Sequence, residues 1–258
     1  MGCCLDAGTS SVRTCRMSVI ATATDLTRSF GKAAPVVDGV SLDVHGGEVL
    51  GLIGPNGGGK STLLMLIAGL IRPSKGTVVV EGIPAHELAL SQTGRVGLIT
   101  AVPGLYPLLS GRENLQFFGG LNGLSLAETD AMSAPLLQEL GIADQMDRRV
   151  AEYSSGMQQK VSLVRALLMK PALLLLDEPT SNLDPVSTHT IHQSVRQQAD
   201  QGVAVVLATH DLHAADSICD RVAVQQRTLR HVTTLDGERQ APNPGQLYQL
   251  YDAWVDSV

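Results

Sequence analysis

A glycine-rich segment near residue 54 constrains the fold of this chain more than any other feature of its sequence. The segment fits the pattern G-x-x-x-x-G-K-[ST] and reads Gly54-Pro55-Asn56-Gly57-Gly58-Gly59-Lys60-Ser61-Thr62. An apolar run over 48–53 predicts a strand before it, and a run over 60–71 predicts a helix after it, which Pro73 ends. A strand, a glycine-rich loop and a helix in this order hold phosphate groups, because successive backbone N–H groups and the helix N-terminus point at one anion.

The polar side chains of this segment suit a phosphate ligand and a divalent cation. Lys60 would bring a positive charge to the outer phosphates, and Ser61 would offer its hydroxyl to Mg²⁺. Thr62 would add a further contact. The segment therefore predicts a phosphate-binding loop with an associated Mg²⁺ site.

A second polar cluster follows a strongly apolar strand. The four leucines 173–176 end abruptly in Asp177 and Glu178. Ligands of open α/β sheets bind at the carboxyl ends of the strands, so both carboxylates are expected beside the phosphate loop. Asp177 would hold Mg²⁺ through water. Glu178, on the other face of the strand, would polarise an attacking water.

The order of the predicted elements indicates a parallel α/β sheet. Strands over 173–177 and 203–209 are joined by a helix from about 185 to 199, and this alternation is typical of parallel sheets covered by helices. A mainly helical run over 106–165 predicts an inserted helical subdomain. The other predicted strands are 21–26, 36–44 and 77–81, and the other predicted helices are 112–119, 127–140 and 157–169.

Composition narrows the possible classes of function. Apolar residues make up 44% of the 258 residues and charged residues 17%, which excludes a disordered chain. The net charge of −6 disfavours a nucleic-acid partner. Cys3, Cys4, Cys15 and Cys219 show no zinc-ligand spacing, which predicts a reduced, cytosolic chain. No run approaches the roughly 20 apolar residues of a membrane span.

The two ends of the chain carry little periodicity. Residues 1–18 are predicted to form a disordered N-terminal extension. Residues 231–258 contain Pro242 and Pro244 and are predicted to form a short C-terminal appendage.

Further motifs follow in order along the chain. They are Tyr153-Ser154-Ser155-Gly156-Met157-Gln158-Gln159-Lys160-Val161, Leu174–Pro179, Ser181-Asn182-Leu183-Asp184 and Thr209-His210-Asp211. With the phosphate loop they resemble the nucleotide-binding domain of ATP-binding cassette (ABC) proteins, and the N-K-x-D motif of GTPases does not occur. The resemblance implies a nucleotide-binding domain over 19–230. It would have a P-loop NTPase (RecA-like) core, an antiparallel β subdomain and an α-helical subdomain inserted at about 103–168.

The resemblance also implies roles for individual residues. Phe30, just after the first strand, would stack on the adenine of ATP. His210 would contact the γ-phosphate and orient Glu178, so that Glu178, His210 and Lys60 form the catalytic set. Ser61 and Asp177 would hold Mg²⁺. The remaining histidines of this part of the chain, His189, His192 and His213, would be surface residues without such a role.

The same family works through paired subunits. Ser154, Ser155, Gly156 and Met157 match its signature loop, which opens a helix that faces the γ-phosphate held by a second nucleotide-binding subunit. Ser181, Asn182, Leu183 and Asp184 match the loop that links the two sites. Because this chain has no predicted span, transport would need a separate transmembrane permease subunit. The chain would then lie at the cytoplasmic face of the membrane.

Two departures from the family pattern stand out. The usual signature is Leu-Ser-Gly-Gly-Gln, whereas this chain has Tyr153-Ser154-Ser155-Gly156-Met157. The family also carries a glutamine that reaches Mg²⁺ and senses the transmembrane partner. That glutamine should fall near Thr100-Ala101-Val102, where this chain has none.

The leading expectation is an ATP-hydrolysing subunit of an exporter. Val96-Gly97-Leu98-Ile99, Gly104-Leu105-Tyr106-Pro107 and Gly111-Arg112-Glu113-Asn114-Leu115 resemble a branch that includes sodium-extruding and drug-resistance exporters. One alternative is a non-transport soluble ABC ATPase acting on nucleic acid or ribosomes. Another is a regulatory module that only binds nucleotide, favoured by the two departures and opposed by the retention of Lys60, Asp177, Glu178 and His210.

Overall fold

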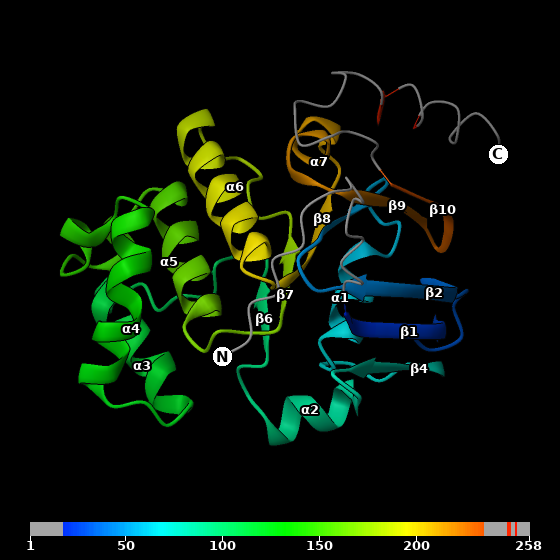
Figure 1. Ribbon diagram of the computed structural model, residues 1–258, viewed down its shortest axis with the longest axis horizontal. Helices are drawn as coiled ribbons and strands as arrows, with labels where there is room; N and C mark the ends of the chain where they lie inside the picture. The colour runs from blue at the N-terminus through cyan, green and yellow to red at the C-terminus, as the bar shows by residue number, and fades with distance from the viewer. Residues whose placement is uncertain (1–17, 235–246, 249–250, 252–258) are drawn as a thin grey trace, which may run out of the picture.

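Two sheets and a group of helices make up the described part of the computed structural model, which covers residues 18–234, 247–248 and 251. A six-stranded sheet has the order β10-β9-β3-β8-β7-β6, and a four-stranded sheet has the order β2-β1-β4-β5. In Figure 1 the central strands separate the four-stranded sheet, on one side, from helices α3, α4 and α5 on the other.

The bounds of the elements are as follows. The strands are β1 (Val19–Arg28), β2 (Val37–His45), β3 (Val49–Ile53), β4 (Lys75–Val80), β5 (Ile83–Pro84), β6 (Val96–Ile99), β7 (Leu173–Asp177), β8 (Ala204–Thr209), β9 (Arg221–Gln226) and β10 (Thr228–Thr234). The helices are α1 (Lys60–Ile67), α2 (Ala85–Ser91), α3 (Gly111–Leu121), α4 (Leu126–Glu139), α5 (Ser155–Leu167), α6 (Pro185–Asp200) and α7 (Leu212–Ile218), with short 3₁₀ turns η1 (Ala143–Gln145) and η2 (Val150–Glu152).

Strand direction brings three separate loops to one edge of the six-stranded sheet. Strand β8 lies between β3 and β7 and is parallel to both. The carboxyl ends of parallel strands lie at the same edge of a sheet. Gly54 follows β3, Glu178 follows β7 and His210 follows β8, so this topology collects the three segments at neighbouring positions.

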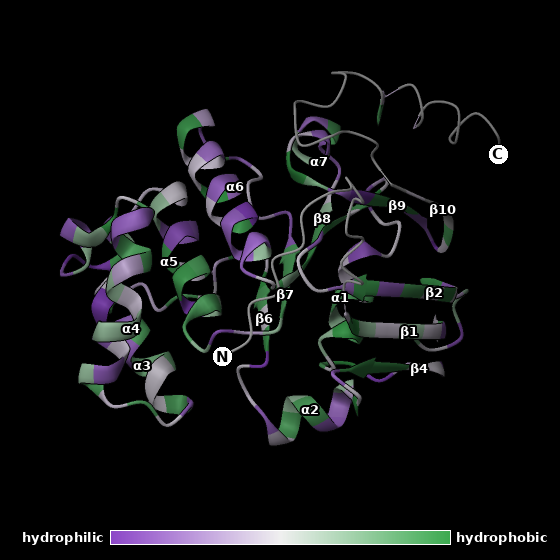
Figure 2. Cartoon of the chain, in the orientation of Figure 1, coloured by the Kyte–Doolittle hydropathy of each residue, from purple (hydrophilic) through white to green (hydrophobic). Residues whose placement is uncertain are grey.

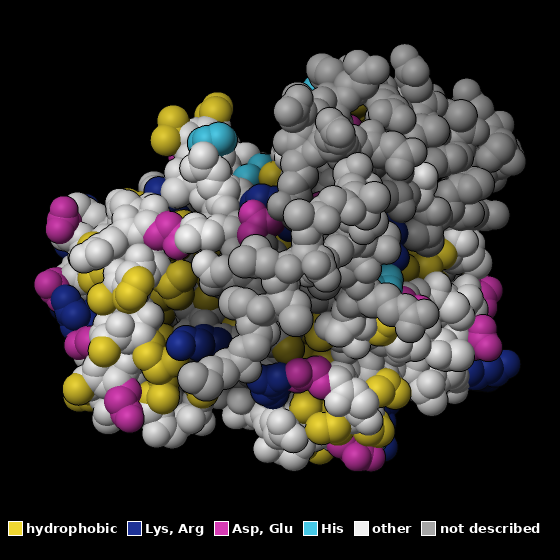
Figure 3. Space-filling view, in the orientation of Figure 1, with side chains coloured by type: hydrophobic (Ala, Val, Ile, Leu, Met, Phe, Trp, Pro, Cys, Tyr) yellow, Lys and Arg dark blue, Asp and Glu magenta, His cyan; other side chains and the backbone are white. Residues whose placement is uncertain are grey.

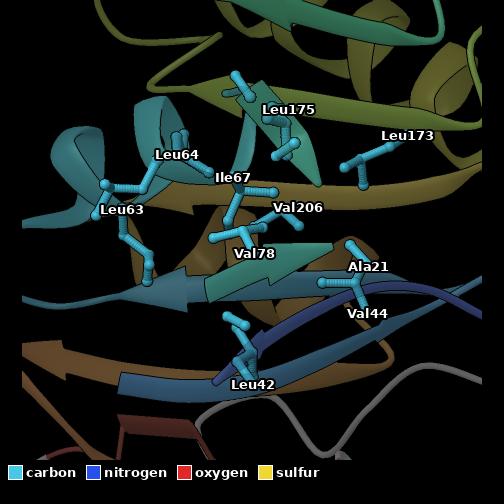
Figure 4. Close-up of a cluster of buried hydrophobic side chains, with 14 of the residues drawn as sticks. Ala21, Leu42, Val44, Leu63, Leu64, Ile67, Val78, Leu173, Leu175 and Val206 are labelled. Atoms are coloured by element: carbon cyan, nitrogen blue, oxygen red, sulfur yellow. The ribbon is translucent and has the colours of Figure 1, made fainter. Parts of the chain in front are cut away.

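The central strands β3, β7 and β8 are apolar up to their last residues, because both faces of the sheet are covered. Side chains alternate along a strand, so neighbouring residues enter different cores. Leu173 and Leu175 join α1 and the four-stranded sheet in one core (Figure 4). Leu174 and Leu176 join the helical side in the other. Helix α6, by contrast, is largely hydrophilic along its length (Figure 2).

Capping residues define where the inserted helices begin. The hydroxyls of Ser110 and Ser125 each accept a hydrogen bond from the backbone N–H three residues further on. The carboxylates of Glu113 and Glu128 in turn accept a hydrogen bond from the backbone N–H of the capping serine. These capping boxes satisfy donors that the first helical turn leaves free. They place the starts of α3 and α4 at Gly111 and Leu126, one residue before the predicted starts at 112 and 127.

Several predicted bounds are corrected by the structure. The helix predicted over 60–71 ends at Ile67, because Gly69 has a left-handed φ of 73° that turns the chain away. The helix predicted from 157 begins at Ser155. Strands β5, β6, β9 and β10 and helices α2 and α7 were not among the predicted elements; each is at most seven residues long.

The predicted ends of the chain fall mostly outside the described residues. Of the extension predicted over 1–18, the structure describes Ser18 alone. Strand β10 crosses the boundary predicted between 230 and 231. Leu247 is fully buried and joins Ile53, Leu212 and residues of β9 in a third small core.

Candidate nucleotide-binding site

The phosphate loop lies tightly against the neighbouring β9 strand and the segment before β2. Gly54 and Gly59 have φ angles of 152° and 97°, which favour glycine. A Cβ atom at Gly54 would lie 2.2 Å from the Gln225 carbonyl oxygen, and one at Gly59 would lie 2.5 Å from the Val36 oxygen. Any larger residue would displace the loop, so these two glycines are needed for its path.

The side chain of Lys60 lies inside this loop. It is 6% exposed, and its Nζ donates hydrogen bonds of 2.7 Å to the Gly54 carbonyl and 3.1 Å to the Pro55 carbonyl. Burial lowers the pKa of the Lys60 amine, while the nearby carboxylates of Glu178 and Asp177 act in the opposite direction. A buried ammonium group with two carboxylates close by is well placed to meet a phosphate anion.

Asp177 and Ser61 form the candidate Mg²⁺ site. Asp177 follows Leu173 and Leu175 on the same side of β7, which places it toward α1 and the Ser61 hydroxyl. Burial raises the pKa of the Asp177 carboxyl, and a hydrogen bond with Ser61 opposes that rise. One carboxylate and one hydroxyl are hard oxygen donors that fit Mg²⁺, which takes few protein ligands beside phosphates and water.

No preformed cluster of three His, Cys, Asp or Glu side chains that could hold a metal occurs within the described residues.

Glu178 is held by the residues that end β8. Its Oε1 accepts hydrogen bonds from the His210 backbone N–H at 3.0 Å and from His210 Nδ1 at 2.7 Å. The Thr209 hydroxyl donates to its Oε2 at 3.3 Å. Glu178 has a φ of 50°, a conformation that costs a non-glycine residue free energy and often marks functional sites. The topology therefore joins the glutamate and the histidine singled out in the sequence.

Glu178, His210 and the 181–183 segment line one cavity of about 640 Å³. His189, His192 and His213 line the same cavity, and the prediction of three surface histidines was wrong for His192, which is 8% exposed. Its pKa is lowered, mainly by burial. The burial of His192 could not be predicted from the sequence, because α6 is largely hydrophilic and only its packing shows which polar residue is covered.

The signature segment begins helix α5. Ser154 is the N-cap, and its hydroxyl accepts a 3.3 Å bond from the Met157 backbone N–H. A Cβ atom at Gly156 would lie 2.5 Å from the Ser187 hydroxyl, so α5 and α6 meet at their N-terminal turns. Asp184 caps α6 by accepting a 2.9 Å bond from the Ser187 N–H.

Helices α5 and α1 pack on opposite faces of the six-stranded sheet. Across the described residues, no hydrogen bond joins 154–157 to the phosphate loop.

Comparison with known proteins shows the family to which the chain belongs. The family model described as ABC transporter matches residues 37–181, more than half of the chain. The chain belongs to the ABC transporter family. Nod factor export ATP-binding protein I of Rhizobium meliloti is 39% identical over 223 residues, covering 85% of this chain and 66% of the relative. ABC transporter ATP-binding protein NatA of Bacillus subtilis (strain 168) is 37% identical, covering 78% and 83%. The chain spans 59–66% of the length of three of the Nod factor export proteins that it matches.

Solved structures place the chain among ATP-binding cassettes. The structure of an ATP binding subunit of an ABC transporter has a TM-score of 0.80 and 31% identity, covering 92% of this chain and 99% of that chain. A dimeric ATP-binding cassette in a post-hydrolysis state, bound to ADP and Pi, has a TM-score of 0.76 and 25% identity, covering 85% and 100%. These similarities confirm the predicted P-loop NTPase core with its antiparallel β subdomain and inserted helices.

The segment Thr100-Ala101-Val102, where the family's glutamine is absent, links the edge strand β6 to the inserted helices. Its Thr100 hydroxyl donates to the Val102 carbonyl at 2.6 Å. Helix α5 holds the next residues, because Ser162 donates to the Pro103 carbonyl at 3.2 Å and Arg165 to the Gly104 carbonyl at 2.9 Å. The segment is therefore tied directly to the helix that begins with the signature.

Three site features escaped the sequence analysis. Thr209, quoted only as part of the Thr209-His210-Asp211 motif, contacts Glu178, and Gln225 lies under the phosphate loop. No signal in the sequence pointed to either contact. Phe30, predicted to stack on adenine, is 48% exposed, and the Arg28 guanidinium carbon lies 4.6 Å from its ring centroid. An arginine two residues before the aromatic residue was the available signal for this contact.

Proposed function

We propose that the chain binds and hydrolyses ATP as the ATP-binding subunit of an export-type ABC transporter. The observation that carries the proposal is that Glu178 accepts two hydrogen bonds from His210, which follows β8. Both residues lie at the sheet edge where Asp177 ends β7 and the phosphate loop with Lys60 follows β3. Hydrolysis of the phosphoanhydride bond of ATP needs a group that orients water, a cation at the phosphates and a preorganised loop. These residues supply all three at one sheet edge.

In this proposal each residue has a distinct task. The phosphate-loop N–H groups of 54–62 and the Lys60 ammonium bind the phosphates of ATP. Mg²⁺, held by Ser61 and Asp177, would supply positive charge that neutralises the phosphate oxygens. Glu178 orients a water molecule and accepts its proton, while His210 holds that carboxylate in place and faces the γ-phosphate. Phe30 stacks on the adenine ring.

The proposal includes a second nucleotide-binding subunit. The N-terminus of α5, with Ser154 to Met157, has backbone N–H groups suited to an anion, yet it makes no hydrogen bond to the phosphate loop within the described part of this chain. Two subunits arranged head to tail would let each α5 face the γ-phosphate held by the other. The 181–184 segments would then connect the two sites. The dimeric cassette among the similar structures supports this arrangement.

A transmembrane permease subunit is the proposed partner for transport. Within the described residues no helix combines the length and hydropathy that a membrane crossing requires. The helical part carries exposed apolar side chains, among them Val102 at 75%, Leu108 at 79% and Phe117 at 42%. Figure 3 shows hydrophobic side chains gathered over this part of the molecule. Exposed apolar patches mark interaction sites, and this one adjoins the segment tied to α5.

The names of the relatives, which include Nod factor export and linearmycin resistance ATP-binding proteins, support export as the direction of transport. The proposed domain covers 19–230, with the helical subdomain at about 103–168, at the cytoplasmic face of the membrane.

Two measurements test the proposal. A steady-state ATPase assay of the full chain, with Lys60→Ala as the inactive control, tests hydrolysis. A tagged pull-down from detergent-solubilised host membranes tests the partner. Turnover lost in Lys60→Ala and recovery of a stoichiometric polytopic protein are the expected results. Recovery with ribosomes or nucleic acid would favour the non-transport ATPase, and nucleotide binding without turnover in the presence of the partner would favour the regulatory module.

A further inference from the structure

The two faces of the Phe30 ring differ in their surroundings. The Arg28 guanidinium lies over one face, with its central carbon 4.6 Å from the ring centroid. The ring is nevertheless 48% exposed, which leaves room for a second planar group. A guanidinium plane and an aromatic ring attract each other through the ring quadrupole and through stacking.

Arg28 is itself held by a hydrogen bond, and part of its guanidinium is buried. Its Nη1 donates a 2.9 Å hydrogen bond to the Arg72 carbonyl, after helix α1. Its Nε is buried and has no hydrogen-bond partner within the described residues, so this side of the guanidinium is removed from water. A cation–π contact is stronger where the cation is desolvated. The guanidinium is therefore a fixed support for the ring.

The segment that carries Phe30 is also attached to the phosphate loop. The Val36 N–H donates a 2.8 Å bond to the Arg28 carbonyl, which closes the segment at its base. The Val36 carbonyl in turn lies so close to Gly59 that a Cβ atom there would be 2.5 Å away. The ring and the phosphate site are thus connected through a short stretch of backbone.

We propose that Arg28 is a positioning residue for the nucleotide base. It holds Phe30 in one orientation, so that the base, the Phe30 ring and the guanidinium form a stack of three layers. This inference rests on the proposed binding of ATP and names a residue that the family motifs do not include. An exposed phenylalanine would otherwise lose side-chain freedom when the base binds, and a support present beforehand removes part of that cost.

The proposal predicts different effects on ligands that contain a base and on ligands made of phosphates alone. Loss of the guanidinium removes only the support behind Phe30, so it should weaken ligands that contain a planar base. It should not weaken a ligand made of phosphates alone. Because every base has a flat face, the stack should favour ATP over inorganic tripolyphosphate without selecting adenine over guanine.

The test is calorimetric titration of the full chain with Mg-ATP and with Mg-tripolyphosphate. Arg28→Gln should weaken ATP binding about three- to tenfold, as expected for one cation–π contact. Its affinity for tripolyphosphate should stay within about twofold of the wild type. The KM for ATP should rise while kcat stays unchanged. Arg28→Lys keeps a cation for the ring quadrupole but loses the planar group, so its affinity for ATP should fall between those of the wild type and Arg28→Gln.

Two further variants control for charge and for folding. Lys32→Gln removes the same charge from an exposed position two residues beyond Phe30, and it should change both affinities by one common factor. In a Phe30→Ala background, Arg28→Gln should have almost no additional effect on ATP.

An equal loss of both ligands in Arg28→Gln, or unchanged ATP binding, would overturn the role of Arg28. Failure of the wild-type chain to bind either ligand would instead overturn the proposed function and this inference together.

Discussion

His210 donates two hydrogen bonds to a single oxygen of Glu178, one from its backbone N–H at 3.0 Å and one from ring Nδ1 at 2.7 Å. An ionised carboxylate has no proton to give, so Nδ1 must carry the proton in this contact. The second ring nitrogen, Nε2, is then directed away from Glu178. The pair thus fixes both the position of the glutamate and the orientation of the imidazole.

Glu178→Gln should separate ATP binding from hydrolysis. The amide keeps an oxygen that can accept from His210, but it cannot accept a proton from water. Turnover should fall by about 100-fold or more, the scale of a lost general base, while ATP affinity changes little. ATP should then accumulate a dimer, detected by size-exclusion chromatography. Glu87→Gln, at an exposed position of helix α2, is the matched control. Turnover equal to the wild type in Glu178→Gln would remove the proposed role of Glu178.

Asp177→Asn should stabilise the nucleotide-free protein and abolish its activity. The pKa of Asp177 is raised, mainly by burial, so its ionised form is less favourable in the folded state than in the unfolded state. Below the ordinary pKa of 3.8 both states are protonated and this cost is absent. The cost appears as pH rises and is complete above the folded-state pKa.

The measurement is the thermal unfolding midpoint in EDTA at several pH values. Asp177→Asn should raise the midpoint by a few degrees at pH 7, and the gain should shrink as pH falls toward 4. A variant less stable than the wild type at pH 7 would show that contacts of the carboxylate outweigh its burial.

Gly156→Ala should destabilise the junction between α5 and α6. The added Cβ would lie 2.5 Å from the Ser187 hydroxyl and 2.9 Å from the Ser187 Cβ, so the helices must move apart. Such overpacking costs about 1–3 kcal/mol of the free energy of unfolding, measured by urea denaturation. Gly120→Ala is the matched control, because it is also helical, with nothing within 4 Å of the new Cβ, and should stabilise by about 0.5–1 kcal/mol.

A double variant tests the same contact directly. Ser187→Gly removes both atoms that the new Cβ would meet, so it should cost less in the Gly156→Ala background than in the wild type. Additive effects would mean that the clash is relieved elsewhere.

His192 should make stability depend on pH near neutrality. Its pKa is lowered, mainly by burial, with Asp211 opposing and His189 adding to that shift. The unfolded state therefore takes up a proton first as pH falls below the ordinary value of 6.5, and the folded state loses stability from there until its own lower pKa is passed. His192→Gln should flatten the unfolding midpoint between pH 7.5 and 5.5, and an unchanged pH profile would contradict this assignment.

Much of the candidate site is local in sequence and was therefore predictable. The 54–62 segment and the Asp177-Glu178 pair each lie at the end of an apolar strand, and short-range rules recognise such patterns. Long, strongly apolar or periodic elements were also found. Runs of two to seven residues carry no distinct periodicity, so the short strands β5, β6, β9 and β10 were missed, whereas β3 and β7, with five residues each, were found from the polar motifs that follow them.

The sequence by itself determined the chemistry available to this protein: a flexible glycine backbone, a lysine and a hydroxyl at the start of a helix, and two carboxylates after a strand. These features depend on residue type and on spacing within a few residues. The tertiary structure alone decided which groups meet. Strand order places His210 between the phosphate loop and Glu178, buries His192, and sets Gly156 against Ser187. The contacts of His210 with Glu178 and of Gly156 with Ser187 join residues about 30 positions apart, and they form because packing of the sheet and its helices, rather than local preference, sets their distance.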